Sequence, residues 1–311
     1  YGRDYLKTHT QPIYNEQYYQ QLHQLYSEIL AELKLKGKHL NNQNVLLPKH
    51  VHYMMPTSAK TFTGNLPYGT TIELGEEAMI GIVWRNEADL DLSATYKNGQ
   101  NISWFEQWHD ENVVYTGDMT ALNEHGFAAE FIAIKAAEQL DEIILNVNPY
   151  YTPNGKTPFQ LIIGKAKTKE MPNIRQTDFE NSQRISDIID IQYVVPFDGC
   201  QNQSLGYIEC VQAIDTSDRF NQLPNQLVFH VANVSNLGKQ VVANAEKMLE
   251  GLMNNQYGQL SVQNWLKLVN ATICYDDQTI VDTEHIIDLR LEQFSLQTLL
   301  DLMEGKVSET A

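Results

Sequence analysis

Two aspartates, Asp89 and Asp91, flank one leucine at the expected start of a β-strand. Side chains alternate along a strand, so both carboxylates point to the same side. Each carboxylate raises the pKa of the other through like-charge repulsion, and a bound divalent cation would offset that cost. Asp118, which follows Gly117, supplies a third carboxylate. Calcium suits such a set because it takes about six to eight oxygen ligands in flexible geometry.

The Asp-x-Asp pair has a second interpretation, which the residues alone leave open. Such pairs are common at strand ends, where they hydrogen-bond to turns or face water. The EF-hand loop pattern is absent, so a calcium site would have to combine separate loops. The sequence also lacks the Gly-x-Ser-x-Gly, P-loop, His-Glu-x-x-His and Gly-x-Gly-x-x-Gly motifs, which argues against the common hydrolases and nucleotide-binding enzymes.

Aromatic and acidic residues gather just after the Asp-x-Asp pair and allow two further hypotheses. One hypothesis concerns a cluster made of Trp104, Trp108 and His109. These side chains form either an aromatic platform for a sugar or peptide or the packing of a hairpin. A hydrolase would use two carboxylates from a set of three: Glu106, Asp110 and Glu111. The sequence does not give the separation of these carboxyl groups, so the hydrolase stays an alternative.

Histidines and cysteines elsewhere give weaker signals. A polar stretch holds three irregularly spaced histidines, His39, His50 and His52. We expect them to be solvated, and a metal site is the alternative. Cys200 and Cys210 flank a Gln/Asn-rich turn and are either incidental thiols or a pair that senses oxidants.

The elements that must position the acidic residues form a β-sandwich over residues 57–167. Short β-type runs alternate with turn signals in this part of the chain. The expected strands are Thr70–Leu74, Ala78–Trp84, Leu90–Tyr96, Ile102–Phe105, Glu130–Ile134, Glu142–Val147 and Phe159–Ile163. Turn residues such as Asn98-Gly99 separate them.

The flanking regions have a different pattern. Residues 1–56 are expected to hold one helix, capped by Asn15 and ended by Gly37, and then a linker or extended crossover from Lys38 to Pro56. Residues 168–311 alternate strand-like and helix-like segments. The predicted fold is therefore α+β and multidomain, with a central antiparallel β-sandwich between an N-terminal helix and a C-terminal α+β region.

Composition restricts the classes of partner. The chain of 311 residues carries 39 acidic and 22 basic residues, a net charge of −17, which disfavours nucleic acid and favours a divalent cation. Three cysteines without metal-type spacing suggest a cytoplasmic protein. No transmembrane segment is predicted, while peripheral membrane association stays open. The chain begins with Tyr1 and shows no signal-peptide pattern, so we expect an excised fragment.

Two motifs resemble the tellurium-resistance TerD family. The segment from Trp84 to Ala94 is similar to that family's Asp-Leu-Asp-x-Ser-Ala motif, and the segment from Val114 to Thr120 resembles its His-Ser/Thr-Gly-Asp-x-x-Thr block. Glu130 resembles the acidic residue that opens the family's next strand. Two lead-in segments, Ser58–Phe62 and Leu66–Gly69, resemble a larger actinobacterial and myxobacterial branch that joins RING-like and TerD-like regions. The tail of that branch is matched more loosely, by Asp190–Pro196, Leu227–Asn233 and Tyr257–Leu266, so the resemblance covers about residues 57–275.

The resemblance implies a calcium-binding β-sandwich in which Asp89, Asp91 and Asp118 are ligands and Glu130 is a fourth. Tyr115 stands where the family often has histidine, and residues 123–129 lack its acidic run, so one calcium ion is expected rather than two. The implied function is a non-enzymatic scaffold that binds protein partners in a bacterial stress response of the tellurite- or phage-resistance type. A hydrolase and a metal-independent interaction module are the alternatives.

Overall fold

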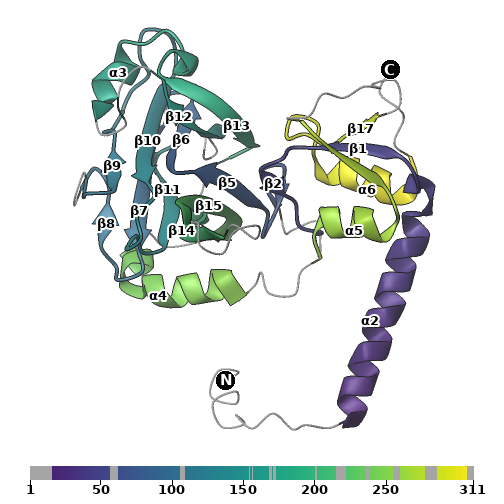
Figure 1. The fold of residues 1–311 in the computed structure, drawn as a ribbon. Coiled ribbons are helices and arrows are strands. Elements are labelled where there is room, and N and C mark those ends of the chain that lie inside the picture. The colour runs from purple at the N-terminus through teal and green to yellow at the C-terminus, as the bar shows by residue number, and fades with distance from the viewer. Residues whose placement is uncertain are drawn as a thin grey trace.

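A computed structural model gives the fold (Figure 1). The structure describes residues 16–56, 62–105, 109–153, 155, 157–167, 170, 173–199, 202–214, 222–235, 239–254, 260–276 and 286–306. Within these residues the protein is α+β, with mostly antiparallel sheets and a few helices. No helix in the described part of the chain is long and apolar enough to cross a membrane.

Two antiparallel sheets face each other in a sandwich-like arrangement. The first, called the β6 sheet, has the order β13 (Ile189–Phe197), β12 (Phe159–Ala166), β6 (Glu77–Trp84), β10 (Ala128–Lys135) and β9 (Val113–Tyr115). The second, called the β7 sheet, has the order β2 (Val51–His52), β5 (Thr71–Gly75), β15 (Gln222–Ser235), β14 (Gln203–Ile214), β11 (Ile143–Tyr151), β7 (Asp89–Tyr96) and β8 (Asn101–Ile102). Their apolar inner faces form one continuous core.

Alternation along β7 sets the orientation of the acidic residues. Leu90, Leu92 and the later even-numbered residues of β7 belong to the core between the sheets. The odd-numbered residues of β7 therefore point to the outer face of the β7 sheet, and Asp89 and Asp91 are among them. The same holds on β11, where Leu145 and Val147 enter the core and Asn146 and Asn148 take the outer face.

The predicted strands are present with shifted ends, whereas β9 and two short strands between residues 62 and 67 were not predicted. The sheets also take three strands from beyond residue 167, because β13 pairs with β12, and β14 joins β11 to β15. One outer strand of the β6 sheet and two inner strands of the β7 sheet thus come from the region that the sequence predicts as a separate C-terminal unit. A short hairpin of β3 (Phe62–Thr63) and β4 (Leu66–Pro67) lies beside β15.

The stretch from Lys38 to Pro56, expected as a linker or an extended crossover, holds the two strands β1 and β2. The first, β1 (Asn44–Leu47), lies between β16 (Thr272–Tyr275) and β17 (Ile286–Asp288) and is parallel to both. Val45 and Leu47 are fully buried there. A strand this short lacks a periodic pattern of its own, and its partners lie more than two hundred residues away, so local sequence did not reveal it.

Helices cover this small parallel sheet and one face of the sandwich. The helices α5 (Val262–Leu268) and α6 (Leu296–Glu304) lie beside β1, and the long α2 (Glu16–Lys36) extends away from the body (Figure 1). The short η1 (Lys38–Leu40) follows α2 in the chain and precedes β1. The helix α4 (Lys239–Asn254) packs on the outer face of the β7 sheet through Val241 and Ala245. The helix α3 (Gln176–Glu180) and η3 (Ile185–Asp187) precede β13.

Candidate metal centre

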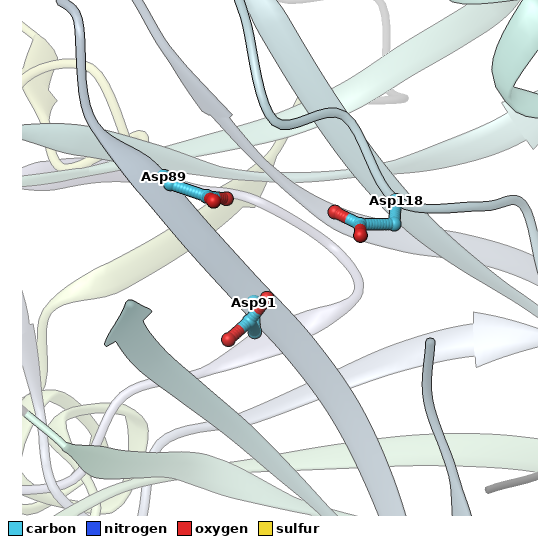
Figure 2. A group of neighbouring side chains, drawn as sticks. All are labelled: Asp89, Asp91 and Asp118. Carbon is cyan, nitrogen blue, oxygen red and sulfur yellow. The ribbon is translucent and has the colours of Figure 1, made fainter. Parts of the chain in front are cut away.

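Three carboxylates converge beside the first residues of β7. Asp89 and Asp91 come from β7, and Asp118 comes from the loop after β9; we call them the acidic triad. Figure 2 shows Asp89 and Asp118 directed toward each other, with Asp91 next to them on the strand of Asp89. One oxygen of each carboxylate lies within 4.8 Å of the others, and all three residues are half-buried. The structure thus brings together the three aspartates expected from sequence.

Gly117 explains how the loop delivers Asp118. Its φ of +127° lies in a region that favours glycine, and a Cβ at this position would lie 2.7 Å from the Cβ of Gln176. The close approach allows the Gln176 amide to donate a 2.6 Å hydrogen bond to the carbonyl of Thr116. The start of α3 thereby fixes the loop that carries Asp118.

Glu130 lies behind the triad and is not part of it. This side chain is fully buried on β10, and its Oε2 accepts a 2.7 Å hydrogen bond from the Leu92 amide. Its Oε1 accepts a 3.3 Å hydrogen bond from the Met119 amide, and the Tyr115 hydroxyl interacts with the same carboxyl group. Glu130 therefore holds the backbone next to Asp91 and Asp118, and it positions these residues instead of joining their oxygens.

The electrostatics of the site favour a cation. Burial, followed by the charges of Asp89 and Asp118, raises the pKa of Asp91 to about 7, although a hydrogen bond from Trp104 acts in the opposite direction. Burial and then Asp118 raise the pKa of Asp89 as well. Burial raises the pKa of the Glu130 carboxyl. No lysine or arginine of the described residues forms an ion pair with the triad, so its negative charge has no protein counterion there.

Several oxygen atoms at the site are buried and accept no hydrogen bond from the described residues. They are Oδ1 of Asp89, Oδ1 of Asp118 and Oδ1 of Asn148. Burying an acceptor without a partner costs about 1–3 kcal/mol, so such atoms call for a ligand. Asn148 lies directly across from Asp91 in the pairing of β11 with β7, and opposite residues have Cβ atoms about 5 Å apart on the same face. Asn148 was missed from sequence, because only the strand register places it here.

The other acidic and aromatic candidates have mixed outcomes. Trp104 interacts with Asp91, so this aromatic residue belongs to the edge of the site. Asp110 accepts hydrogen bonds from the amides of Asn112 and Val113, each 2.8 Å long, and from the Tyr96 hydroxyl, which makes it a turn residue. Glu111 is exposed and His109 forms an isolated bridge with Val114. Glu106 and Trp108 lie outside the described residues.

The histidines and cysteines form no metal cluster within the described part of the chain. His50 and His52 each lie 3.0 Å from a carboxylate oxygen of Glu73, and all three side chains are about half exposed. His39 is exposed. Cys210 is free and half-buried, and Cys200 lies outside the described residues.

Comparisons with known proteins give no relative for this site: no family model, no curated protein and no solved structure matches the chain. The case for a metal centre therefore depends on the residues themselves. An oxygen-only ligand set, with buried acceptors that have no partner, could hold a metal ion.

Proposed function

We propose that the acidic triad binds one calcium ion and that the protein is a non-enzymatic, calcium-dependent scaffold. The observation that carries this proposal is the convergence of three carboxylates whose oxygens lie within 4.8 Å of one another. In the same cluster, the buried Oδ1 atoms of Asp89 and Asp118 accept no hydrogen bond from the described residues. A cation would neutralise the charge and bind these oxygens.

Calcium fits the donor set better than other common metal ions. Zinc favours nitrogen and sulfur ligands, and magnesium requires near-ideal octahedral geometry and keeps several waters. Calcium binds oxygens at about 2.4 Å, so two oxygens on one ion lie no more than about 4.8 Å apart. The triad meets this limit. The amide oxygen of Asn148 is a candidate fourth protein ligand, in place of the carboxylate of Glu130.

A bound ion would connect the start of β7 to the loop after β9, two segments that both donate backbone hydrogen bonds to Glu130. Asp89 and Asp91 belong to a strand, whereas Asp118 belongs to a loop, so shared coordination would stiffen that loop and order a surface for a protein partner. Support for the biological setting comes from the resemblance of both motifs to the TerD family. We therefore assign the scaffold to a cytoplasmic bacterial stress response of the tellurite- or phage-resistance type.

Isothermal titration calorimetry on chelator-treated protein tests the calcium site. We expect saturable uptake of one calcium ion, strong loss of affinity in Asp89→Asn and Asp118→Asn, and no change in Asp190→Asn, whose carboxylate is exposed on β13. Magnesium should compete only weakly. Absence of calcium uptake by folded wild-type protein would refute the proposal, and turnover of a hydrolase substrate that needs the triad would favour an enzyme.

Terbium luminescence locates the ion within the molecule. Terbium replaces calcium at oxygen sites and emits when a nearby tryptophan is excited. Because Trp104 contacts Asp91, its replacement in Trp104→Phe should remove most of the emission while calcium uptake persists. Trp265, buried against α2, gives the matched control, and emission that depends on Trp265 instead would place the ion elsewhere.

A further inference from the structure

A cavity adjoins the acidic triad on the outer face of the β7 sheet. It has a volume of about 500 Å³ and lies between β7, β11 and the first turn of α4, where Val241 and Val242 form one wall. This volume is within the usual range for small-molecule pockets, about 300–1,000 Å³. Gly99 allows α4 to come this close, because a Cβ there would lie 2.8 Å from the carbonyl oxygen of Val242.

Most of the exposed area of the cavity lining is apolar, but six of the described side chains that line it carry hydroxyl or amide groups and one carries a carboxylate. Its side chains with hydroxyl or amide groups are Ser93, Thr95, Asn101, Ser103, Asn146 and Asn148. Asp91 supplies the carboxylate, and no lysine, arginine or histidine is among the described residues that line the cavity. An anionic ligand would meet no cationic side chain among these residues, whereas a neutral ligand with many hydroxyl groups could both donate and accept hydrogen bonds there.

A chain of hydrogen bonds fixes the polar floor. The Asn146 amide donates to the Thr95 hydroxyl at 3.1 Å, and that hydroxyl donates to Oδ1 of Asn101 at 2.9 Å. The Asn101 amide in turn donates to the Ser103 hydroxyl at 3.0 Å. Ser103 only accepts hydrogen bonds within the described residues, so its own proton stays free for a ligand. A prearranged floor of this kind limits the ordering cost of binding.

Two aromatic side chains stand at the mouth of the cavity. Trp104 is 41% exposed and Phe105 is 74% exposed, and their rings meet edge to face with centroids 5.4 Å apart. Large exposed aromatic rings beside a polar floor offer an apolar surface against which the C–H face of a sugar ring can pack. Hydroxyl-binding groups on one side and an aromatic surface on the other match a pyranose.

The cavity and the triad share Asp91, which lines the first and belongs to the second. Across the strand pair, Asn148 also lines the cavity, and its buried Oδ1 accepts no hydrogen bond from the described residues. Calcium takes about six to eight ligands, more than three carboxylates and one amide supply when each gives one oxygen. Open coordination positions would therefore face the cavity, where two adjacent hydroxyls of one ligand could fill them.

We propose that this cavity binds a neutral saccharide through neighbouring hydroxyls that ligate the calcium ion, with the ring packed on Trp104. The metal bridge depends on the calcium site proposed above, whereas the floor and the aromatic mouth are independent of it. The protein then recruits a glycan or glycoside as part of its scaffold role, and it performs no reaction on the sugar.

Saturation-transfer NMR with methyl glycosides of glucose, galactose, mannose, fucose and N-acetylglucosamine tests the proposal on the full chain. We expect transfer from the protein to at least one glycoside in calcium, and loss of that signal in a chelator. At saturating calcium, Trp104→Ala should weaken glycoside binding about tenfold, as for other aromatic anchors. Tyr150→Ala, which removes an aromatic ring that is 75% exposed and does not line the cavity, should bind like wild type.

The outcomes separate the two proposals. Calcium uptake without transfer to any of these glycosides would overturn the saccharide site and leave the calcium site intact. Transfer that persists unchanged in a chelator would overturn the metal bridge. A protein that takes up no calcium would overturn the calcium site, and glycoside binding by that protein would show that the cavity acts alone. Equal binding by Trp104→Ala would contradict the role of the aromatic mouth.

Discussion

Replacing Asp91 by asparagine should change the stability of the protein in opposite directions without and with calcium. In the metal-free protein, Asp91 has a pKa of about 7 against an ordinary value of 3.8, because it is partly buried and faces two further carboxylates. The folded state therefore holds an extra proton between these two pH values. The stability contributed by this group is greatest at low pH and falls as pH rises from about 4 to 7.

The magnitude follows from the size of the pKa change. A difference of about three pKa units corresponds to roughly 4 kcal/mol, and discounting by about half for the exposed part of the side chain leaves about 2 kcal/mol. In a chelator at pH 8, Asp91→Asn should therefore be more stable than wild type by about 2 kcal/mol, a rise in Tm of roughly 4–8 °C. At pH 4 the difference should disappear, because Asp91 is then protonated in the folded protein.

Calcium should reverse the order. When free calcium is a hundred times its Kd, the ion stabilises the wild type by about 2.7 kcal/mol. The variant lacks one carboxylate ligand and should gain much less. Thermal unfolding followed by circular dichroism at pH 8, in chelator and in calcium, measures both effects, with Asp190→Asn as the control. If Asp91→Asn were the less stable protein in chelator, the account of charge repulsion would be refuted.

Three further substitutions test the surrounding structure. Glu130→Gln replaces one acceptor oxygen by an amide group that cannot accept a hydrogen bond. In a urea titration in chelator, this change should lower the free energy of unfolding by about 1–3 kcal/mol. The control Glu124→Gln, on the surface, should leave it unchanged. Gly81→Ala places a Cβ 2.2 Å from the carbonyl oxygen of Glu130 and should cost about 1–3 kcal/mol in the same titration, unless β6 and β10 can separate. Trp265→Ala removes a fully buried ring that donates a hydrogen bond to the Leu33 carbonyl. The free energy of unfolding should fall by about 3–5 kcal/mol, and α2 should be proteolysed faster. Unchanged proteolysis would contradict the role of Trp265 in holding that helix.

Much of the sandwich was predictable from sequence because its strands are local patterns. The run from Ala78 to Trp84 is apolar at almost every position, as expected for a central strand covered on both faces, and it forms β6. Local signals also mark the starts of α5 and α6, where the side chains of Ser261 and Ser295 each accept a hydrogen bond from an amide three residues later.

What could not be predicted depends on contacts between distant residues. The sequence gives no signal that β14 and β15 complete the sheet of β7, since pairing partners are set by topology and not by local pattern. Glu130 was expected as a fourth ligand because it resembles the acidic residue that opens the next strand in the TerD family. Only the crossing of β10 behind β7 turns its carboxyl toward the Leu92 amide. Asn148 was missed for the same reason.

The short length of β8 has a consequence for association with other chains. β8 pairs with β7 only at Ala94 and Thr95, which leaves the first half of β7 as an edge on that side. Exposed edges invite strand addition from a neighbouring molecule. Here the Leu92 amide already donates its hydrogen bond to Glu130, so it is not available to an incoming strand. The acidic triad would also repel the carbonyl oxygens of that strand. The carboxylates that we propose as calcium ligands would therefore also protect the sheet against edge-to-edge aggregation.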